Sequence, residues 1–336
     1  MPGLLPRTLA AGPAAALTTA ALTTAALTTT ALTTAALTTA ALAATVLAAG
    51  SVPFAAAPAR ASDAPVCVSA RHPVLAKRLG RRITAALAGR TGTESVAVYD
   101  RERGVRCGVL AGRHYDSASV VKTAILAALL REAATAHRPL TASEDALATR
   151  MITRSDNRAA SALWRSVGPG RLDRFLRKAG MAHTALDPAG HWGLTRTTAA
   201  DQITLLRRLT EHNALLTDDA RAYELGLMHR VIASQRWGAT AGTPAGITWH
   251  VKNGWLPRHG KEWRVHSVGA FTGRGEHYLI AVLTQGAPTM AYGVETIERV
   301  ARAVHGDLAP GSRAAIPGGV PDGVPETSDG SVPPGA

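Results

Sequence analysis

Ser119-Val120-Val121-Lys122 opens a long apolar stretch and places a hydroxyl group and an amine three residues apart. In a helix, a three-residue step returns two side chains to the same face, about 4.5 Å apart along the axis. The first turn of a helix also has unpaired N–H groups and the positive end of the helix dipole, which favour an attacking alkoxide and the oxyanion it creates. The stretch therefore predicts Ser119 as a nucleophile and Lys122 as its base, the alternative being a plain polar helix start.

Two later motifs favour the catalytic interpretation. Ser155-Asp156-Asn157 and Lys252-Asn253-Gly254 follow in an order that resembles the S-x-x-K, S-D-N and K-T-G motifs of class A β-lactamases and penicillin-binding proteins. The residues that flank the second motif and those that follow the third resemble this superfamily as well. The resemblance extends over about residues 71–305.

The resemblance implies a role for each motif. Lys252 would come from a strand that lines the cleft and would help Ser155 move a proton to the leaving group. Asn157 would face the substrate amide, and the backbone N–H groups of Ser119 and Trp255 would form the oxyanion hole. The remaining substrate contacts that the resemblance implies are Asn253, Gly254 and Arg264, of which Arg264 would hold a carboxylate. Asp156 is expected to brace its loop, and a serine at position 155 is also an ordinary helix N-cap.

The sequence departs from the class A pattern at two places. Asn253 replaces the usual Thr or Ser, so it retains a hydrogen-bond donor but loses the hydroxyl that binds a β-lactam carboxylate. The stretch 186–194 stands where class A enzymes carry the deacylating glutamate, yet it is shortened and contains no Glu. Asp187 matches the Asp that opens that loop, and His191 is the only candidate for a substitute base. Without a carboxylate that activates water, hydrolysis of the acyl-enzyme is expected to be slow.

These features predict a secreted serine acyl-hydrolase of the class A β-lactamase-like group, acting on a β-lactam or a related amide. One alternative is a D-Ala-D-Ala carboxypeptidase-like enzyme that acts on peptidoglycan stem peptides. Another is a penicillin-binding sensor that is acylated without turnover. We expect a monomer with no metal and no cofactor.

The periodicity of the apolar residues predicts an α+β fold. Strands at both ends of the domain and helices between them indicate an antiparallel sheet beside an all-helical lobe at about 117–240. The resemblance implies the same architecture, with five strands and with N-terminal and C-terminal helices flanking the sheet. The expected strands are 95–99, 105–110, 248–252, 264–271 and 278–284, and the expected long helices are 73–90, 117–135 and 291–305.

The two ends of the chain have compositions unlike the domain at 62–305. Residues 9–50 are almost wholly Ala, Leu and Thr, and the small residues of Ala59-Arg60-Ala61 are typical of a signal-peptidase site. Residues 1–61 are therefore expected to be a signal peptide, with an uncut membrane anchor as the alternative because the segment is long. Residues 306–336 are rich in Pro and Gly, which predicts a disordered tail.

The net charge and the cysteines fit an exported protein. The formal charge is +13, and because Arg7 and Arg60 are the only charges before Asp63, cleavage after Ala61 leaves +11. Such a protein is expected to associate with anionic cell-wall polymers. Scattered arginines and few aromatic residues exclude a nucleic-acid interface.

The only cysteines of the chain are Cys67 and Cys107. Neither has the spacing of a metal site. In a secreted protein such a pair can form a disulfide, with two free thiols as the alternative.

Overall fold

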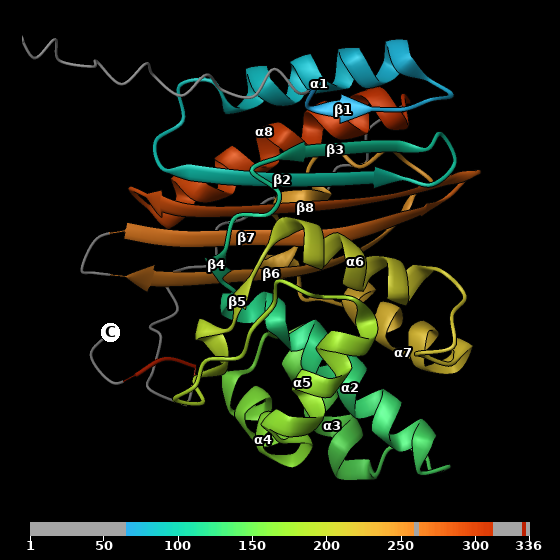
Figure 1. Cartoon of the computed structure of the whole chain (residues 1–336), viewed down its shortest axis with the longest axis vertical. Coiled ribbons are helices and arrows are strands. Elements are labelled where there is room, and N and C mark those ends of the chain that lie inside the picture. Colours follow the sequence, from blue (N-terminus) through green and yellow to red (C-terminus); the bar gives the residue numbers. More distant parts are fainter. Residues whose placement is uncertain (1–64, 259–261, 312–330, 334–336) are drawn as a thin grey trace, which may run out of the picture. The chain divides into compact units, whose positions relative to one another are not determined.

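The computed structural model describes residues 65–258, 262–311 and 331–333, all within one unit, Arg60–Ala336. Its centre is an antiparallel sheet of six strands in the order β1-β3-β2-β8-β7-β6 (Figure 1). The expected signal peptide, residues 1–61, lies outside the described residues. The strands of this sheet are β1 (Cys67–Val68), β2 (Thr93–Asp100), β3 (Val105–Val109), β6 (Thr248–Arg258), β7 (Glu262–Gly273) and β8 (Glu276–Ala287).

The five predicted strands are confirmed, and the count of five is wrong because a sixth strand is added at the edge. That strand, β1, has only two residues, which is too short to produce an alternating apolar pattern. The strand β6 also continues beyond the predicted end at residue 252, as far as Arg258. This extension matters for function because β6 is the other edge of the sheet and carries the third motif.

Side chains on the two faces of the sheet alternate between two apolar cores. Val96, Val98 and Ile280 lie in one core with side chains of α1 (Pro73–Leu87) and α8 (Met290–Leu308). Ala97 and Ala281, one residue further along the same strands, lie in the core of the helical lobe. The period-2 alternation of the strands therefore separates the flanking helices from the lobe.

The helical lobe lies on the opposite face of the sheet from α1 and α8 (Figure 1). At its centre α2 is buried on nearly every side, with eleven of its fifteen residues in the interior, as its apolar sequence predicts. The helices of the lobe are α2 (Val121–Thr135), α3 (Ala142–Thr153), α4 (Asn157–Val167), α5 (Pro169–Ala179), α6 (Ala199–Thr210) and α7 (Asp218–His229).

Short elements connect the lobe to the sheet. The strands β4 (Tyr115–Asp116) and β5 (Arg196–Thr197) form a separate two-stranded sheet, and β4 leads directly into the short 3₁₀ helix η1 (Ala118–Val120). The other 3₁₀ helices are η2 (Trp192–Leu194), η3 (Ala233–Gln235) and η4 (Gly238–Thr240). Of the helices in the described part of the chain, none combines the length and apolar character needed to cross a membrane.

The end of the chain differs from the prediction of a disordered tail over 306–336. The helix α8 continues to Leu308, so the domain ends later than expected. Residues 331–333 are also described, and the side chains of Ser331 and Val332 are buried against the rest of the domain. The other residues of the predicted tail beyond 311 lie outside the described ranges.

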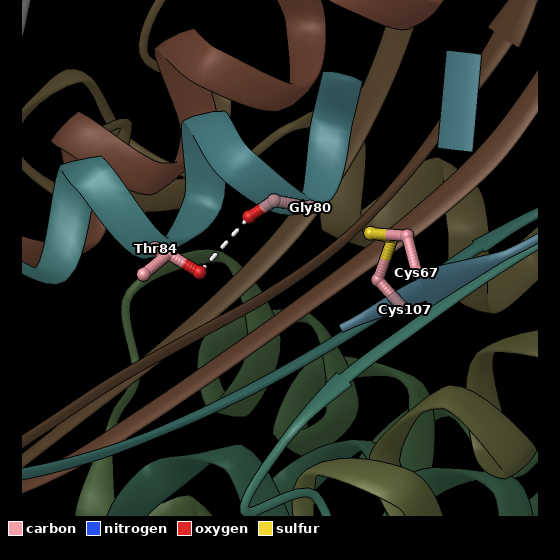
Figure 2. Close-up of a disulfide and its surroundings, with 4 residues drawn as sticks. All are labelled: Cys67, Gly80, Thr84 and Cys107. Atoms are coloured by element: carbon pink, nitrogen blue, oxygen red, sulfur yellow. Dashed lines mark hydrogen bonds between the residues drawn. A yellow bond between two sulfur atoms is a disulfide. The ribbon is translucent and has the colours of Figure 1, made fainter. Parts of the chain in front are cut away.

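A disulfide holds the short edge strand β1 in place. Cys67 and Cys107 lie directly opposite each other on β1 and β3 and are joined through their sulfur atoms, as Figure 2 shows. The same figure shows Gly80 on α1, where a Cβ would lie 3.4 Å from the Cys67 nitrogen, at ordinary contact distance. The disulfide therefore ties the first described residues to the sheet and closes a loop with a sequence separation of 40.

Replacing both cysteines by serine is expected to lower the free energy of unfolding by about 4 kcal/mol, because the unfolded chain regains the entropy of the open loop. Urea unfolding followed by circular dichroism measures this loss. As a control, a reducing agent should destabilise the unaltered protein and leave the double variant unchanged. Equal stability of the two proteins without reductant would contradict the prediction.

Candidate active site

The predicted nucleophile lies at the junction of the sheet and the lobe. Ser119 is the middle residue of η1 and is 8 % exposed. The first turn is therefore a 3₁₀ turn, and the α-helix begins at Val121. Ala118 has a φ of 46°, a left-handed conformation that costs energy in a residue with a side chain. This strained residue turns the chain from β4 into η1 immediately before the serine.

Lys122 enters the site from the second position of α2. Its side chain is fully buried, and its Nζ donates hydrogen bonds to the Ser155 carbonyl oxygen at 2.7 Å and to Asn157 Oδ1 at 2.6 Å. The same nitrogen lies 4.7 Å from the ring centroid of Trp192, which is a cation–π contact. The amine of the first motif therefore touches the second motif.

Ser155 connects the two lysines. Its Oγ lies 3.1 Å from Lys122 Nζ and 2.9 Å from Lys252 Nζ, and its φ of 55° is again left-handed. The N-cap of α4 is not Ser155 but Asp156, whose Oδ1 accepts a hydrogen bond from the Ala159 N–H at 2.7 Å. Because Asp156 takes over the capping role, the Ser155 hydroxyl is left for the lysines.

Lys252 is buried on β6, with 1 % of the residue exposed. Burial and the neighbouring Lys122 ammonium lower the pKa of Lys252 well below its ordinary value. Its Nζ also donates to the carbonyl oxygen of Asn253 at 2.7 Å. The lowered pKa makes Lys252 a better proton donor, and its Nζ lies within hydrogen-bond distance of the Ser155 hydroxyl.

Gly254 lets β6 approach the nucleophile. A Cβ atom at this position would lie 2.8 Å from the Ser119 nitrogen and 2.9 Å from the Val120 nitrogen, closer than any real Cβ contact. The strand therefore packs directly on the backbone N–H groups of η1. Trp255, the second predicted oxyanion donor, follows Gly254 on this edge strand, and its side chain lies in the core on the other face of the sheet.

Two of the residues predicted to contact the substrate are bonded to other groups of the protein. The Asn253 side chain is 2 % exposed, and its Nδ2 donates to the carbonyl oxygens of Gln235 and Trp237 at 2.9 and 3.1 Å. Its amide nitrogen is thus hydrogen-bonded to the backbone around η3 and η4. Arg264 Nε lies 3.0 Å from Asp116 Oδ2, so this side of the guanidinium is engaged in an ion pair within the protein.

The stretch 186–194, which lacks Glu, forms a loop closed by its own residues. Asp187 Oδ2 lies 3.0 Å from both the backbone nitrogen and Nδ1 of His191. Trp192 anchors the end of the loop, since its Nε1 donates to Ser161 Oγ at 3.0 Å while its ring faces Lys122. No role was predicted for Trp192 from the sequence, although a single bulky aromatic residue in a short loop with Gly and Pro is a signal that could have found it.

The C-terminal residues 331–333 border this loop. The Gly193 N–H donates to the Ser331 carbonyl oxygen at 2.8 Å, and a Cβ on Gly193 would lie 2.5 Å from that oxygen. Val332 packs in a small apolar cluster with Ala118 and Leu256. Ala118 precedes the nucleophile and Leu256 follows Trp255, so this segment forms one wall beside the site.

Solved structures share this fold. A β-lactamase from Xanthomonas campestris pv. campestris is 23 % identical, with a TM-score of 0.60 over 70 % of this chain and 98 % of that one. The TLA-1 extended-spectrum β-lactamase is 18 % identical, with a TM-score of 0.62 over 68 % of this chain and 98 % of its own. PBP-A is 20 % identical, with a TM-score of 0.59 over 68 % of this chain and 94 % of its own. A mutant of PBP-A has been solved as an acyl-enzyme complex with penicillin G.

A comparison with curated protein sequences finds no match. In contrast, residues 137–308, which include the second and third motifs, match the model of the Beta-lactamase enzyme family. This match spans half of the chain, and the fold shared with the solved structures agrees with it. The chain therefore belongs to the Beta-lactamase enzyme family, as a serine hydrolase with a β-lactamase-like fold.

Proposed function

We propose that this protein is a secreted enzyme that opens a β-lactam or a related amide through an acyl-Ser119 intermediate and releases the acyl group slowly. The observation that carries the proposal is the Ser155 hydroxyl, held 3.1 Å from Lys122 Nζ and 2.9 Å from Lys252 Nζ. This chain of polar atoms is a route for protons between the nucleophile's side of the site and a leaving group. The positive net charge of the domain would hold the exported enzyme near anionic wall polymers.

In the acylation step, Ser119 Oγ attacks the carbonyl carbon of the amide. The serine proton passes to Lys122 in its neutral amine form, and the backbone N–H groups of Ser119 and Trp255 stabilise the oxyanion. When the C–N bond breaks, the leaving nitrogen takes a proton from the Ser155 hydroxyl, which is replenished from the lysines that contact it. The proton lost by Ser119 is thus balanced by the proton gained by the leaving amine.

Deacylation needs a water molecule and a base for its proton. The loop 186–194 contains one carboxylate, Asp187, and that carboxylate is occupied by the backbone and ring nitrogens of His191. Beside Lys122 the loop presents the Trp192 ring rather than an acidic group. An aromatic ring cannot take a proton from water, which supports slow release of the acyl group.

A second candidate function is that of a D-Ala-D-Ala carboxypeptidase-like enzyme acting on peptidoglycan stem peptides. The absence of Glu from the loop favours this alternative, and so does the likeness of the fold to PBP-A. In the third alternative, a penicillin-binding sensor, the acyl group would remain on Ser119. All three functions share the same acylation step and differ in the fate of the acyl group.

Intact-mass spectrometry after mixing the protein with a fluorescent penicillin tests the proposal. We expect one adduct per chain, which forms within minutes and decays over hours, and no adduct on Ser119→Ala. A lasting adduct would favour the peptidase or the sensor, and cleavage of a D-Ala-D-Ala peptide would separate these two. Labelling that survives in Ser119→Ala, or no labelling of the unaltered protein, would overturn the assignment.

Gly254→Ala is expected to slow adduct formation at least about 100-fold, because a Cβ forced against the Ser119 nitrogen displaces the nucleophile and its oxyanion donor. Overpacking of this kind also costs about 1–3 kcal/mol of stability. The rate of adduct formation is measured by quenching the reaction at set times and recording the intact mass. The matched control is Gly112→Ala, where a Cβ would meet nothing within 4 Å. Equal rates for the two variants would refute the close contact.

Lys252→Met is expected to abolish adduct formation and yet to raise the free energy of unfolding at pH 7 by about 0.5–2 kcal/mol. The pKa of Lys252 is lower in the folded protein than in the unfolded chain, so the unfolded chain binds the extra proton as the pH falls below about 10.4. The unaltered protein should therefore gain stability relative to the variant as the pH rises from 7 toward 10. Urea unfolding of both proteins at several pH values measures this difference in the free energy of unfolding. Lys77→Met, on the exposed face of α1, is the control.

A further inference from the structure

Three arginines surround one carboxylate beside the nucleophile. Arg264 Nε lies 3.0 Å from Asp116 Oδ2, Arg258 Nε lies 3.9 Å from the same oxygen, and Arg196 Nη1 lies 3.8 Å from Oδ1. The side chains of Arg258 and Arg264 are only 17 % and 14 % exposed, whereas that of Arg196 is 54 % exposed. The cluster is thus mostly enclosed and opens to solvent on the side of Arg196.

The charges in this cluster do not cancel. Glu262 is the other acid that acts on Arg264, so three guanidinium groups face two carboxylates. His266 adds no charge at neutral pH, since burial lowers its pKa to about 4 and its Nε2 contacts the Asp116 carbonyl oxygen at 2.8 Å. Among the described residues, the buried atoms Arg258 Nε and Arg264 Nη1 have no hydrogen-bond partner. Buried guanidinium N–H groups without acceptors are costly unless a ligand supplies them.

Along β6, the cluster lies beyond Trp255, on the side away from Lys252. Asp116 is three residues before Ser119, so their Cα atoms are at most about 11 Å apart. Along β6, Lys252 precedes the oxyanion donor Trp255 and serves the leaving group, whereas Arg258 lies three residues beyond Trp255. In an extended strand, Lys252 and Arg258 are about 20 Å apart. A substrate whose carbonyl lies at Ser119 therefore directs its leaving group toward Lys252 and its acyl group toward Arg258.

We propose that Arg196, Arg258 and Arg264 form a subsite for a carboxylate on the acyl part of the substrate. The proposal rests on the proposed function. It explains how an enzyme that lacks the usual Thr or Ser hydroxyl, and whose Asn253 amide is bound to the backbone, can still anchor an anionic substrate. A guanidinium group is the donor best suited to a carboxylate, because its parallel N–H groups match the two oxygens.

Two penicillins that differ by one acyl-side carboxylate test the subsite. Carbenicillin carries this group and benzylpenicillin does not, and the second-order rate constant of acylation is measured for each by mass spectrometry. We expect the unaltered protein to favour carbenicillin at least about tenfold, as a charged hydrogen-bonded contact implies. Arg258→Gln and the more exposed Arg196→Gln should reduce this ratio toward one. Arg274→Gln, at the turn between β7 and β8, should keep it. A ratio near one in the unaltered protein, or a ratio unchanged by both substitutions, would overturn the subsite.

A binding measurement without chemistry separates failure of the subsite from failure of the proposed function. Phenylmalonamate reproduces the carbenicillin acyl group as an amide with one carboxylate, and phenylacetamide reproduces that of benzylpenicillin as a neutral amide. Titration calorimetry on the unaltered protein should give phenylmalonamate at least about tenfold tighter binding, weakened by salt and lost in Arg258→Gln. If neither penicillin forms an adduct while phenylmalonamate binds in this way, the subsite stands and the acylation proposal fails. Equal binding of the two amides would refute the subsite whatever the penicillins do.

Discussion

The site depends on one hydroxyl group held between two buried lysines. Bringing Lys122 and Lys252 to the Ser155 oxygen places two amines close together in an interior that disfavours charge, and this lowers the pKa of Lys252. The arrangement is costly, so the rest of the fold has to enforce it. A helix with eleven buried residues fixes Lys122, an edge strand packed on η1 fixes Lys252, and the left-handed backbone of Ser155 is held by the cap at Asp156.

Much of the fold and the centre of the site could be predicted from the sequence. The spacing of Ser119 and Lys122 depends only on local helix geometry, and the apolar run after them has to be buried. Ser155 and Lys252 were recognised through their neighbours in the sequence. The first motif lies on η1 and α2, the second at the start of α4, and the third on β6. These residues meet because the fold brings the three places together.

The features that could not be predicted depend on contacts between distant residues. The edge strand β1 is too short for any periodicity, and it exists because Cys67 is bonded to Cys107. The direction of the Asn253 amide is decided by the carbonyl groups of η3 and η4 that lie beside it. Similarly, Arg264 was expected either to hold a substrate carboxylate or to be a surface arginine. Only the pairing of β6 with β7 shows that it shares Asp116 with Arg258.

One edge of the sheet has a consequence for the behaviour of the protein at high concentration. Strands at the edge of a sheet present unpaired backbone groups that can join another chain and start aggregation. Here one edge is the two-residue strand β1, which is fastened to its neighbour β3 by a covalent bond. Beyond holding the fold together, the disulfide thus keeps β1 over β3 and shields the Cys107 strand from self-association.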